Sequence, residues 1–190
     1  EEAEAGLPDG AIRIHALITE TAGGMLSATS FAGKSARLSA LVWGAEDLAA
    51  DIGASSNKDE SGRSTDVFRL ARSLTILAAA HAGVDAIDTV FTNFRDPDGL
   101  DAECRAAVRD GFAGKMAIHP DQVGVINAAF TPAPADVERA VRILALFAAA
   151  GPDAGVLSLD GKMIDRPHLR QAERVARRAG LEPGALPVQD

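Results

Sequence analysis

The sequence predicts an α/β protein built on a parallel sheet, and three observations point to that class. Apolar residues make up 47% of the 190 residues, enough to bury a core. Four short apolar runs have the length and composition of strands. The segments between them are longer and repeat their apolar residues with a helical period. Strands that alternate with helices predict βα units joined by right-handed crossovers.

The expected elements can be placed in order along the first two thirds of the chain. The four strands are expected at residues 12–18, 38–43, 86–91 and 115–118. The clearest helix is expected at 65–82, with one apolar face formed by Val67, Leu70, Ala71, Leu74, Leu77 and Ala78. Shorter helices are expected at 100–109 and 121–129. The polar stretch 54–64 is expected to be a mobile loop after the second strand.

The character of the sequence changes after Phe130. Two prolines within residues 131–134 mark a break, and residues 135–150 have the pattern of an amphipathic helix. Residues 155–164 resemble a hairpin, because Asp160-Gly161 is a strong turn signal. A last helix is expected at 166–179, ended by Gly180.

The number of strands limits the possible architecture. A parallel sheet has both faces covered, and four parallel strands with their helices do not close a barrel. An open half-barrel would expose sheet edges and apolar surface. The chain is therefore either a small open α/β domain or a part of a larger fold.

Charge and cysteine content exclude several classes of protein. Nineteen Lys and Arg residues against 27 Asp and Glu residues give a net charge of −8, which argues against a general nucleic-acid binder. The single cysteine, Cys104, excludes an internal disulfide framework and a Cys-rich zinc site, and it favours a reducing, cytoplasmic compartment. No apolar run reaches the length of a membrane span. The chain starts with Glu rather than Met, so residue 1 is not expected to be a natural start.

Acidic residues follow the first two expected strands. Glu20 comes after the first strand and Asp47 after the second. The carboxyl ends of parallel strands carry the active sites of α/β folds, and Mg²⁺ needs only one or two carboxylates from the protein. The alternative is that both residues cap the helices that follow. Glu46 competes with Asp47 for the role of metal ligand.

Other polar residues have a structural and a functional interpretation. The loop at 92–99 either reaches a ligand or starts a helix. His119 is either a base or a loop residue bonded to backbone, and Pro120 is expected to begin a helix. Asp165 has the position of a helix N-cap. Cys104 is expected to pack in the core rather than to act as a nucleophile, and the Gly23-Gly24 pair is too weak a signal for a phosphate loop.

Five motifs occur in a fixed order along nearly the whole chain. They are ALITETAG at 16–23, GAEDLAAD at 44–51, FRDPDGL at 94–100, GKMAIHP at 114–120 and LDGKMIDRP at 159–167. Each motif alone is moderately specific, but the ordered set is specific. It resembles the citrate lyase β-subunit-like family, within the HpcH/HpaI group of malyl-CoA and citramalyl-CoA lyases and related aldolases.

The resemblance implies a fold that is larger than this chain. The family has a (β/α)8 TIM barrel and is often trimeric. Residues 1–130 would be the C-terminal half of that barrel, with its last four strands, and residues 131–190 a C-terminal helical lid. The family's first half carries an Arg that contacts the substrate, and this Arg has no counterpart here.

The resemblance also implies an activity. It is a magnesium-dependent carbon–carbon lyase that cleaves a 3-hydroxyacyl-CoA, such as citramalyl-, malyl- or citryl-CoA, to acetyl-CoA and a keto acid, with Mn²⁺ as an alternative ion. The matching positions are Glu20 and Asp47 for the metal, Asp165 for proton transfer in a neighbouring subunit, and the backbone at Ala117, Ile118 and His119 for coenzyme A.

Three further points stay open from the sequence. An aldolase acting on free hydroxy-keto acids, a non-catalytic barrel subunit or scaffold, and a complete small binding domain are alternative functions. Because coenzyme A is anionic, binding it needs a local basic rim, for which Lys115 is a candidate unless it is simply solvated. Asn93 stands where an acid is common in the family, which bears on substrate preference.

Overall fold

A computed structural model describes residue 2 and residues 4–181 of the chain. These residues form an α/β structure that divides into two compact units, Glu1–Asn127 and Ala128–Asp190. The α/β class expected from the sequence is therefore confirmed. Within the described residues, no helix combines the length and the apolar character that a membrane span requires.

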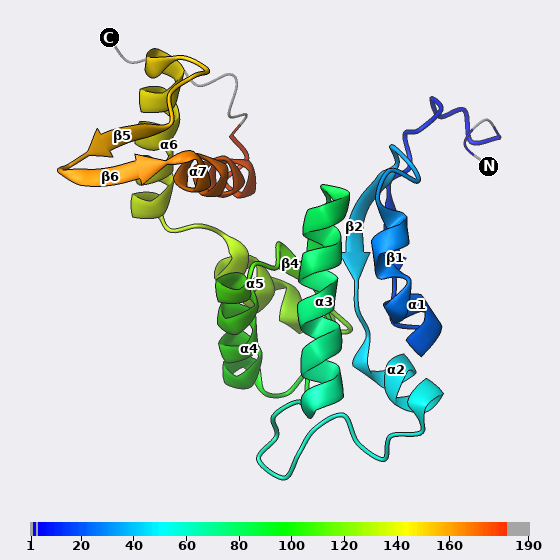
Figure 1. Cartoon of the computed structure of the whole chain (residues 1–190). Coiled ribbons are helices and arrows are strands. Elements are labelled where there is room, and N and C mark those ends of the chain that lie inside the picture. Colours follow the sequence, from blue (N-terminus) through cyan, green and yellow to red (C-terminus); the bar gives the residue numbers. More distant parts are fainter. Residues whose placement is uncertain (1, 3, 182–190) are drawn as a thin grey trace. The chain divides into compact units, whose positions relative to one another are not determined.

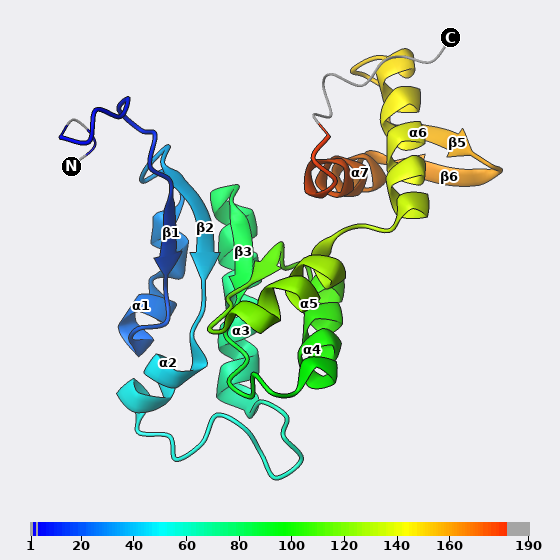
Figure 2. The same ribbon diagram turned by 180° about the vertical axis from the view of Figure 1, so that it is seen from behind.

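The first unit is built on a four-stranded sheet. Its strands are β1 (Ile14–Leu17), β2 (Leu38–Val42), β3 (Asp85–Asp88) and β4 (Gly114–Lys115). They lie in chain order, β1-β2-β3-β4, and each neighbouring pair is parallel. Figure 2 shows β1, β2 and β3 side by side. All four expected strands are present, but each is shorter than its apolar run.

Side-chain hydrogen bonds explain where the last two strands stop. The expected strand at 115–118 ends at Lys115, because the side chain of Gln122 accepts hydrogen bonds from the backbone N–H groups of Ile118 and His119. The expected strand at 86–91 ends at Asp88, and the carbonyl of Phe91 accepts from Gln122 as well. The sheet ladder is replaced here by contacts to one side chain.

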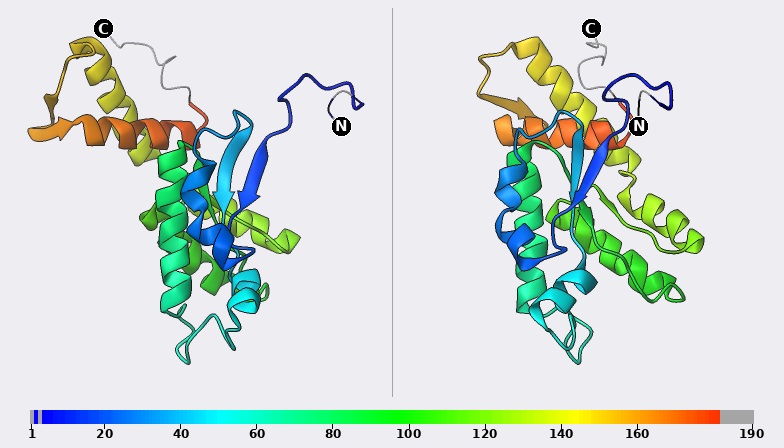
Figure 3. Two further views of the ribbon diagram at one scale, coloured as in Figure 1. Left: turned by 45° about the vertical axis from the view of Figure 1, so that its right-hand side comes forward. Right: turned by 90° about the vertical axis from the view of Figure 1, so that its right-hand side faces the viewer.

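Helices connect the strands. They are α1 (Ala22–Leu26), the 3-10 turn η1 (Ala28–Phe31), α2 (Ala45–Ile52), α3 (Asp66–Ala82), α4 (Pro97–Asp110) and α5 (Pro120–Phe130). In Figure 1, α3 runs along the sheet, and in the right panel of Figure 3, α1 and α3 lie on the same side of β1 and β2. The stretch at 54–64 joins α2 to α3 without forming a helix or a strand of its own.

The expected apolar face of α3 is wrong in part. The helix buries Phe68, Ala71, Thr75, Ala78 and Ala79. Val67, Leu70 and Leu77 are 50%, 59% and 65% exposed. The large ring of Phe68, 1% exposed, takes the core position, which rotates the buried face away from Val67. We call Val67, Leu70 and Leu77 the apolar stripe of α3.

Two helix starts follow from local capping. The side chain of Asp96 accepts a hydrogen bond from the N–H of Gly99, so α4 begins at Pro97, three residues before the expected start. A Cβ at position 99 would collide with the Asp96 carboxylate, so the cap requires Gly99. Helix α5 begins at Pro120, as expected.

The second unit contains a helix, a hairpin and a second helix. They are α6 (Pro134–Ala150), β5 (Val156–Leu159), β6 (Lys162–Asp165) and α7 (Arg166–Arg178). The antiparallel hairpin turns at Asp160 and Gly161, whose φ angles are 53° and 73°, so the expected hairpin is confirmed. Its core is a cluster formed by Ala140, Ile143, Leu144, Phe147, Leu159, Ile164, Ala172 and Ala176.

Candidate functional site

The carboxyl ends of β1 and β2 are joined by the side chain of Thr19. Its hydroxyl accepts a hydrogen bond from the N–H of Gly44 at 2.6 Å and donates to the carbonyl of Gly44 at 2.9 Å. Thr19 is fully buried. This pair fixes the chain immediately before Glu20 and three residues before Asp47, at one edge of the sheet.

Both expected metal ligands are exposed at this edge. Glu20 follows β1, and Asp47 lies in the first turn of α2 after β2. The Oδ2 atom of Asp47 lies back over the end of the sheet, because a Cβ added to Gly44 would be 3.2 Å from it and 3.8 Å from the hydroxyl oxygen of Thr19. We call Glu20 and Asp47 the exposed carboxylate pair.

The competing acid, Glu46, has a different partner. Its Oε1 atom accepts a hydrogen bond from Asn57 Nδ2 at 2.8 Å. Asn57 belongs to the loop between α2 and α3, so Glu46 is engaged with that loop. The structure thereby distinguishes Glu46, which is bonded to Asn57, from Asp47, whereas their positions in the sequence did not.

Neither member of the exposed carboxylate pair is a helix cap. Thr21 is the N-cap of α1 and accepts a hydrogen bond from the N–H of Gly24. Gly44 is the N-cap of α2. Asp51 supports the same corner, because its Oδ2 atom accepts from the N–H of Ala22 at 2.7 Å. Neither residue is therefore an N-cap, although Asp47 lies in the first turn of α2, where the helix dipole favours a negative charge.

The chemistry of this edge suits a hard divalent cation. No group of three or more His, Cys, Asp or Glu side chains with metal-binding geometry occurs among residues 2 and 4–181. The available donors are two carboxylates that follow neighbouring parallel strands. Mg²⁺ is commonly held by one or two carboxylates together with water and substrate oxygens. The residues present fit that mode of binding.

The loops after β3 and β4 are held together by Gln122. This side chain, 2% exposed, accepts from the N–H groups of Ile118 at 2.9 Å and His119 at 3.3 Å, and its Nε2 atom donates to the carbonyl of Phe91 at 2.8 Å. We call these contacts the Gln122 clamp. The clamp fixes the backbone of the segment that the sequence assigned to coenzyme A.

An aromatic stack lies over the same segment. The rings of Phe94 and His119 are parallel within 15°, with centroids 4.7 Å apart. The guanidinium of Arg95 lies 5.4 Å from the centroid of the Phe94 ring. His119 Nδ1 accepts from the N–H of Asp121 at 3.3 Å, so its backbone-bonded interpretation is confirmed. Ala117 and Ile118 are exposed beside it.

Lys115 is not part of a basic rim, and it is not solvated. Its side chain is completely buried, and its Nζ atom pairs with Asp88 at 3.1 Å and with Glu103 at 3.2 Å. Asp88 also accepts from Trp43 Nε1 at 2.7 Å and pairs with Arg72. We call these five residues the buried ion-pair cluster. Both interpretations of Lys115 offered by the sequence are wrong.

Cys104 has the properties of a core residue. It is fully buried, and burial raises the pKa of its thiol to about 11. Because the thiolate is the nucleophilic form, this cysteine is inert at neutral pH. The packing role expected for it is supported.

Asp165 lies in the second unit and is described there alone. It is the N-cap of α7, and its carboxylate accepts from the N–H of His168 at 3.4 Å. Its Oδ1 atom is 2.5 Å from His168 Nδ1, and this hydrogen bond is the main reason that the pKa of Asp165 lies below its usual value. The expected N-cap is confirmed, and the histidine is a partner that the sequence interpretation missed.

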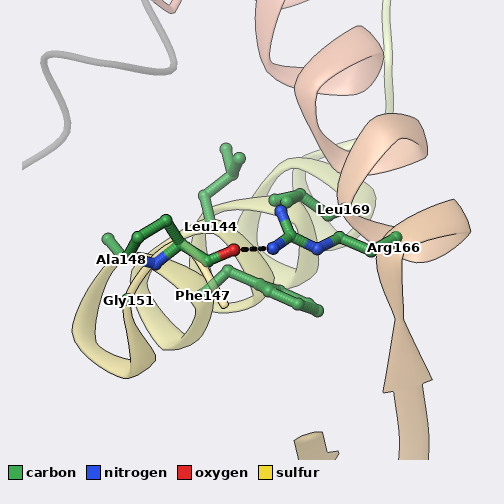
Figure 4. A pocket seen from close by; sticks show the side chains of 7 residues that line it. Leu144, Phe147, Ala148, Gly151, Arg166 and Leu169 are labelled. Atoms are coloured by element: carbon green, nitrogen blue, oxygen red, sulfur yellow. Dashed lines mark hydrogen bonds between the residues drawn. The ribbon is translucent and has the colours of Figure 1, made fainter. Parts of the chain in front are cut away.

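An open hollow of about 310 Å³ also lies in the second unit (Figure 4). Leu144, Phe147, Ala148 and Leu169 line it, and Arg166 donates a hydrogen bond to the carbonyl of Pro152 at its rim. Polar groups that converge on a ligand usually mark a binding site. The lining here is mainly apolar and the guanidinium is already engaged, so the strand ends remain the better candidate.

The comparison with known protein families matches most of the first unit of this chain. Residues 1–120 match the family described as "HpcH/HpaI aldolase/citrate lyase". The chain is 40% identical over 139 residues to mitochondrial citramalyl-CoA lyase of Mus musculus, which covers 73% of this chain and 40% of that protein. It is 37% identical over 161 residues to (3S)-malyl-CoA thioesterase of Cereibacter sphaeroides, covering 84% and 54%.

This chain is also similar to the solved structure of a related protein. The protein CitE from Mycobacterium tuberculosis, in complex with magnesium, acetoacetate and coenzyme A, matches with a TM-score of 0.67 at 37% identity. The match covers 84% of this chain and 58% of that one. The chain thus spans about half the length of the relatives that it matches.

Proposed function

The chain belongs to the HpcH/HpaI aldolase/citrate lyase family, and we therefore propose that it is part of a magnesium-dependent carbon–carbon lyase. The substrate is a 3-hydroxyacyl-CoA thioester such as citramalyl-, malyl- or citryl-CoA. The products are acetyl-CoA and a keto acid. Relatives named citramalyl-CoA lyase and (3S)-malyl-CoA thioesterase support this substrate class.

The observation that carries the proposal is the exposed carboxylate pair. Glu20 and Asp47 follow neighbouring parallel strands, neither caps a helix, and Thr19 holds the two strand ends together. No hydrogen bond or ion pair in the described part of the chain uses either carboxylate. Two acids that follow neighbouring strand ends and have no protein partner support a cation site at this edge.

These two residues would hold Mg²⁺, or Mn²⁺ in its place. The bound ion would supply Lewis acidity at the substrate oxygen where charge develops. Glu20 and Asp47 contribute two negative charges at this edge, which favour a divalent cation over a monovalent one. Glu46 stays with Asn57 and keeps the loop after α2 in place.

Asp165 would act on the product side of the cleavage. The substrate hydroxyl would lose its proton to solvent, and breaking the bond between the hydroxyl-bearing carbon and the carbon beside the thioester would then form the keto acid and the enolate of acetyl-CoA. Its carbon then takes a proton, and a positioned carboxylic acid is a suitable donor. Asp165 is one-third exposed at the start of α7 and is therefore accessible to a substrate or to another subunit.

The segment at Ala117, Ile118 and His119 would contact coenzyme A. The Gln122 clamp fixes its backbone, and Ala117 and Ile118 are exposed. Because Lys115 is buried, the nearby cation for an anionic ligand is Arg95, whose guanidinium lies against Phe94 at the surface. We assign to Arg95 the role that the sequence gave to Lys115.

The same proposal extends to architecture and assembly. A parallel sheet in chain order is the arrangement that a barrel segment would have, and it supports the proposal that residues 1–130 are half of a (β/α)8 barrel and 131–190 its lid. The apolar stripe of α3 supports a homo-oligomer, with a trimer as the family expectation, because clustered exposed apolar side chains mark contact surfaces. A reduced Cys104 is compatible with the cytoplasm.

Calorimetry with Mg²⁺ and Mn²⁺ tests the proposed site. Asp47→Ala should abolish binding, while the matched variant Glu46→Ala should keep it, because only Asp47 lies over the strand ends. Equal affinity in both variants would contradict the assignment. A non-catalytic scaffold would bind neither ion in the unmodified chain.

An assay of product formation tests the reaction. Malyl-CoA and citramalyl-CoA, incubated with the chain and Mg²⁺, should yield acetyl-CoA and a keto acid. Release of free coenzyme A would instead indicate a thioesterase. Turnover of a free hydroxy-keto acid, with none of the thioesters, would indicate the aldolase alternative.

A further inference from the structure

Asp165 and His168 share one site at the start of α7. The two residues form a capping box, in which the carboxylate accepts from the N–H of His168 and the imidazole Nδ1 accepts from the N–H of Asp165 at 3.2 Å. In addition, Oδ1 and Nδ1 are only 2.5 Å apart. An ordinary capping box satisfies backbone donors and does not need this direct side-chain contact.

The direct contact requires a proton. A carboxylate oxygen and an unprotonated ring nitrogen both present lone pairs, so at 2.5 Å they repel unless a hydrogen lies between them. If Nδ1 holds the hydrogen, the pair is an imidazole N–H donating to a carboxylate. If Nδ1 instead accepts from the Asp165 N–H, the carboxyl itself carries the hydrogen. In either arrangement the pair holds one proton.

Asp165 alone is a poor acid at neutral pH. Its pKa lies below the ordinary carboxyl value, chiefly because His168 hydrogen-bonds to it. A carboxyl with even an ordinary pKa is protonated in fewer than about one molecule in a thousand at pH 7.5. A donor to an enolate therefore needs a neighbour that can pass it a proton, and an imidazole ring can both take up and release one.

We propose that His168 is a positioning residue that supplies Asp165 with the proton it delivers. This deepens the proposed function and rests on it. The O–H bond of Asp165 breaks as the new C–H bond forms at the enolate carbon. Delivery leaves a carboxylate beside a neutral imidazole. The imidazole then takes up one proton from solvent, since 41% of the His168 side chain is accessible, and the hydrogen on Nδ1 passes to Oδ1, which restores the acid and leaves the imidazole neutral.

Among the groups around this pair, His168 itself is the one that chiefly lowers the pKa of Asp165. The elements that pack with α7 are α6 and the β5–β6 hairpin, and their charged side chains are Asp136, Glu138, Arg139, Arg142, Asp160 and Lys162. Arg142 pairs with Asp160 at 2.5 Å, and Arg166 donates to the carbonyl of Pro152. Within the described part of the chain, His168 is the side chain that contacts the Asp165 carboxylate.

The decisive variant is His168→Gln. Gln is the usual partner in a capping box, so the helix start is preserved, but an amide carries no exchangeable charge at neutral pH. We expect thermal stability close to that of the unmodified chain, an unchanged KM and a kcat at pH 7.5 reduced by at least about tenfold. The alkaline limb of the pH–rate profile should move to lower pH, because Asp165 must then protonate by itself. Gln171→Ala, an exposed change on α7, is the matched control and should keep the profile.

Two results would overturn this inference. One is a pH–rate profile in His168→Gln that superimposes on that of the unmodified chain. The other is independent of activity: NMR titration of the Asp165 carboxyl carbon should follow that of the His168 ring nitrogens, and separate titrations would show that the two groups share no proton. If the unmodified chain cleaves no thioester but the two signals titrate together, the proposed function fails while the shared proton stands.

His168→Ala with added imidazole covers the case in which kcat falls for structural reasons. Recovery of the rate with imidazole supports proton supply, because a small base restores the proton but not the helix cap. Loss of rate without any recovery, together with a normal profile in the Gln variant, contradicts it.

Discussion

The buried ion-pair cluster and the exposed carboxylate pair are two acidic regions of the same unit, and they differ in how their charges are satisfied. Asp88 is 3% exposed and is contacted by Trp43, Arg72 and Lys115. Glu20 and Asp47 are exposed, and no side-chain partner engages them within the described residues. The position of an acid near a strand end is thus not enough to indicate function, because its partners decide what it does.

Removing one member of the cluster should produce the largest effect. Lys115→Met leaves the carboxylate of Asp88 buried without its ammonium partner, which we expect to cost about 3–5 kcal/mol of stability. Urea unfolding measures the change. Lys58→Met is the matched control, because Lys58 pairs with Glu103 at the surface and should cost less than about 1 kcal/mol. A loss below about 1 kcal/mol in Lys115→Met would show that the cluster is not a structural centre.

Removing the Gln122 clamp should cause the second-largest loss of stability. Gln122→Leu keeps the volume of the side chain but leaves three backbone groups without partners, at an expected cost of about 1–3 kcal/mol. Chemical denaturation gives the change in stability, and hydrogen exchange of the Ile118 and His119 amides reports on the loops directly. Unchanged exchange at both amides would contradict a clamping role.

The exposed pair should give the smallest effect on stability. Glu20→Gln and Asp47→Asn remove charges that no protein group neutralises, so each should change the free energy of unfolding by less than about 0.5 kcal/mol. The double variant should nevertheless lose Mg²⁺ affinity in calorimetry. A large destabilisation by either substitution would show that the residue stabilises the fold, as we expect Asp88 to do.

The N-cap of α7 allows a further test, in which the stability contributed by an acid is followed as the pH changes. The pKa of Asp165 is lowered in the fold, so the stability that it contributes is present above its ordinary pKa and is lost as the pH falls through its lower, folded value. Asp165→Ser keeps an N-cap oxygen but does not titrate, so hydrogen exchange of the α7 amides should depend less on pH in the acid range. An identical acid dependence would show that the carboxylate does not stabilise this helix start.

The sequence predicted the parts that depend on local pattern. The four strands, the hairpin at Asp160-Gly161 and the start of α5 at Pro120 follow from apolar runs and turn residues, and they are present in the structure. The position of Asp47 after β2 also followed from local order. These features need only neighbouring residues to form.

The missed features depend on contacts that are distant in the sequence. Lys115 reaches Asp88 across 27 positions, so no local pattern revealed its burial. The end of β4 is set by a side chain on α5, and the buried face of α3 by the packing of Phe68. His168 is different, because a polar residue three positions after an N-cap is a recognisable capping-box signal and was available in the sequence.

The paired hydrogen bonds between Thr19 and Gly44 have a consequence for ion binding. They are made entirely within the protein, so the two strand ends are already in place before a cation arrives. Little backbone entropy is then lost on binding, and affinity depends mainly on exchanging water for carboxylate oxygen. Thr19→Val, which removes the hydroxyl but neither carboxylate, should therefore weaken Mg²⁺ binding through the entropy of binding, a signature that calorimetry separates from the loss of a ligand.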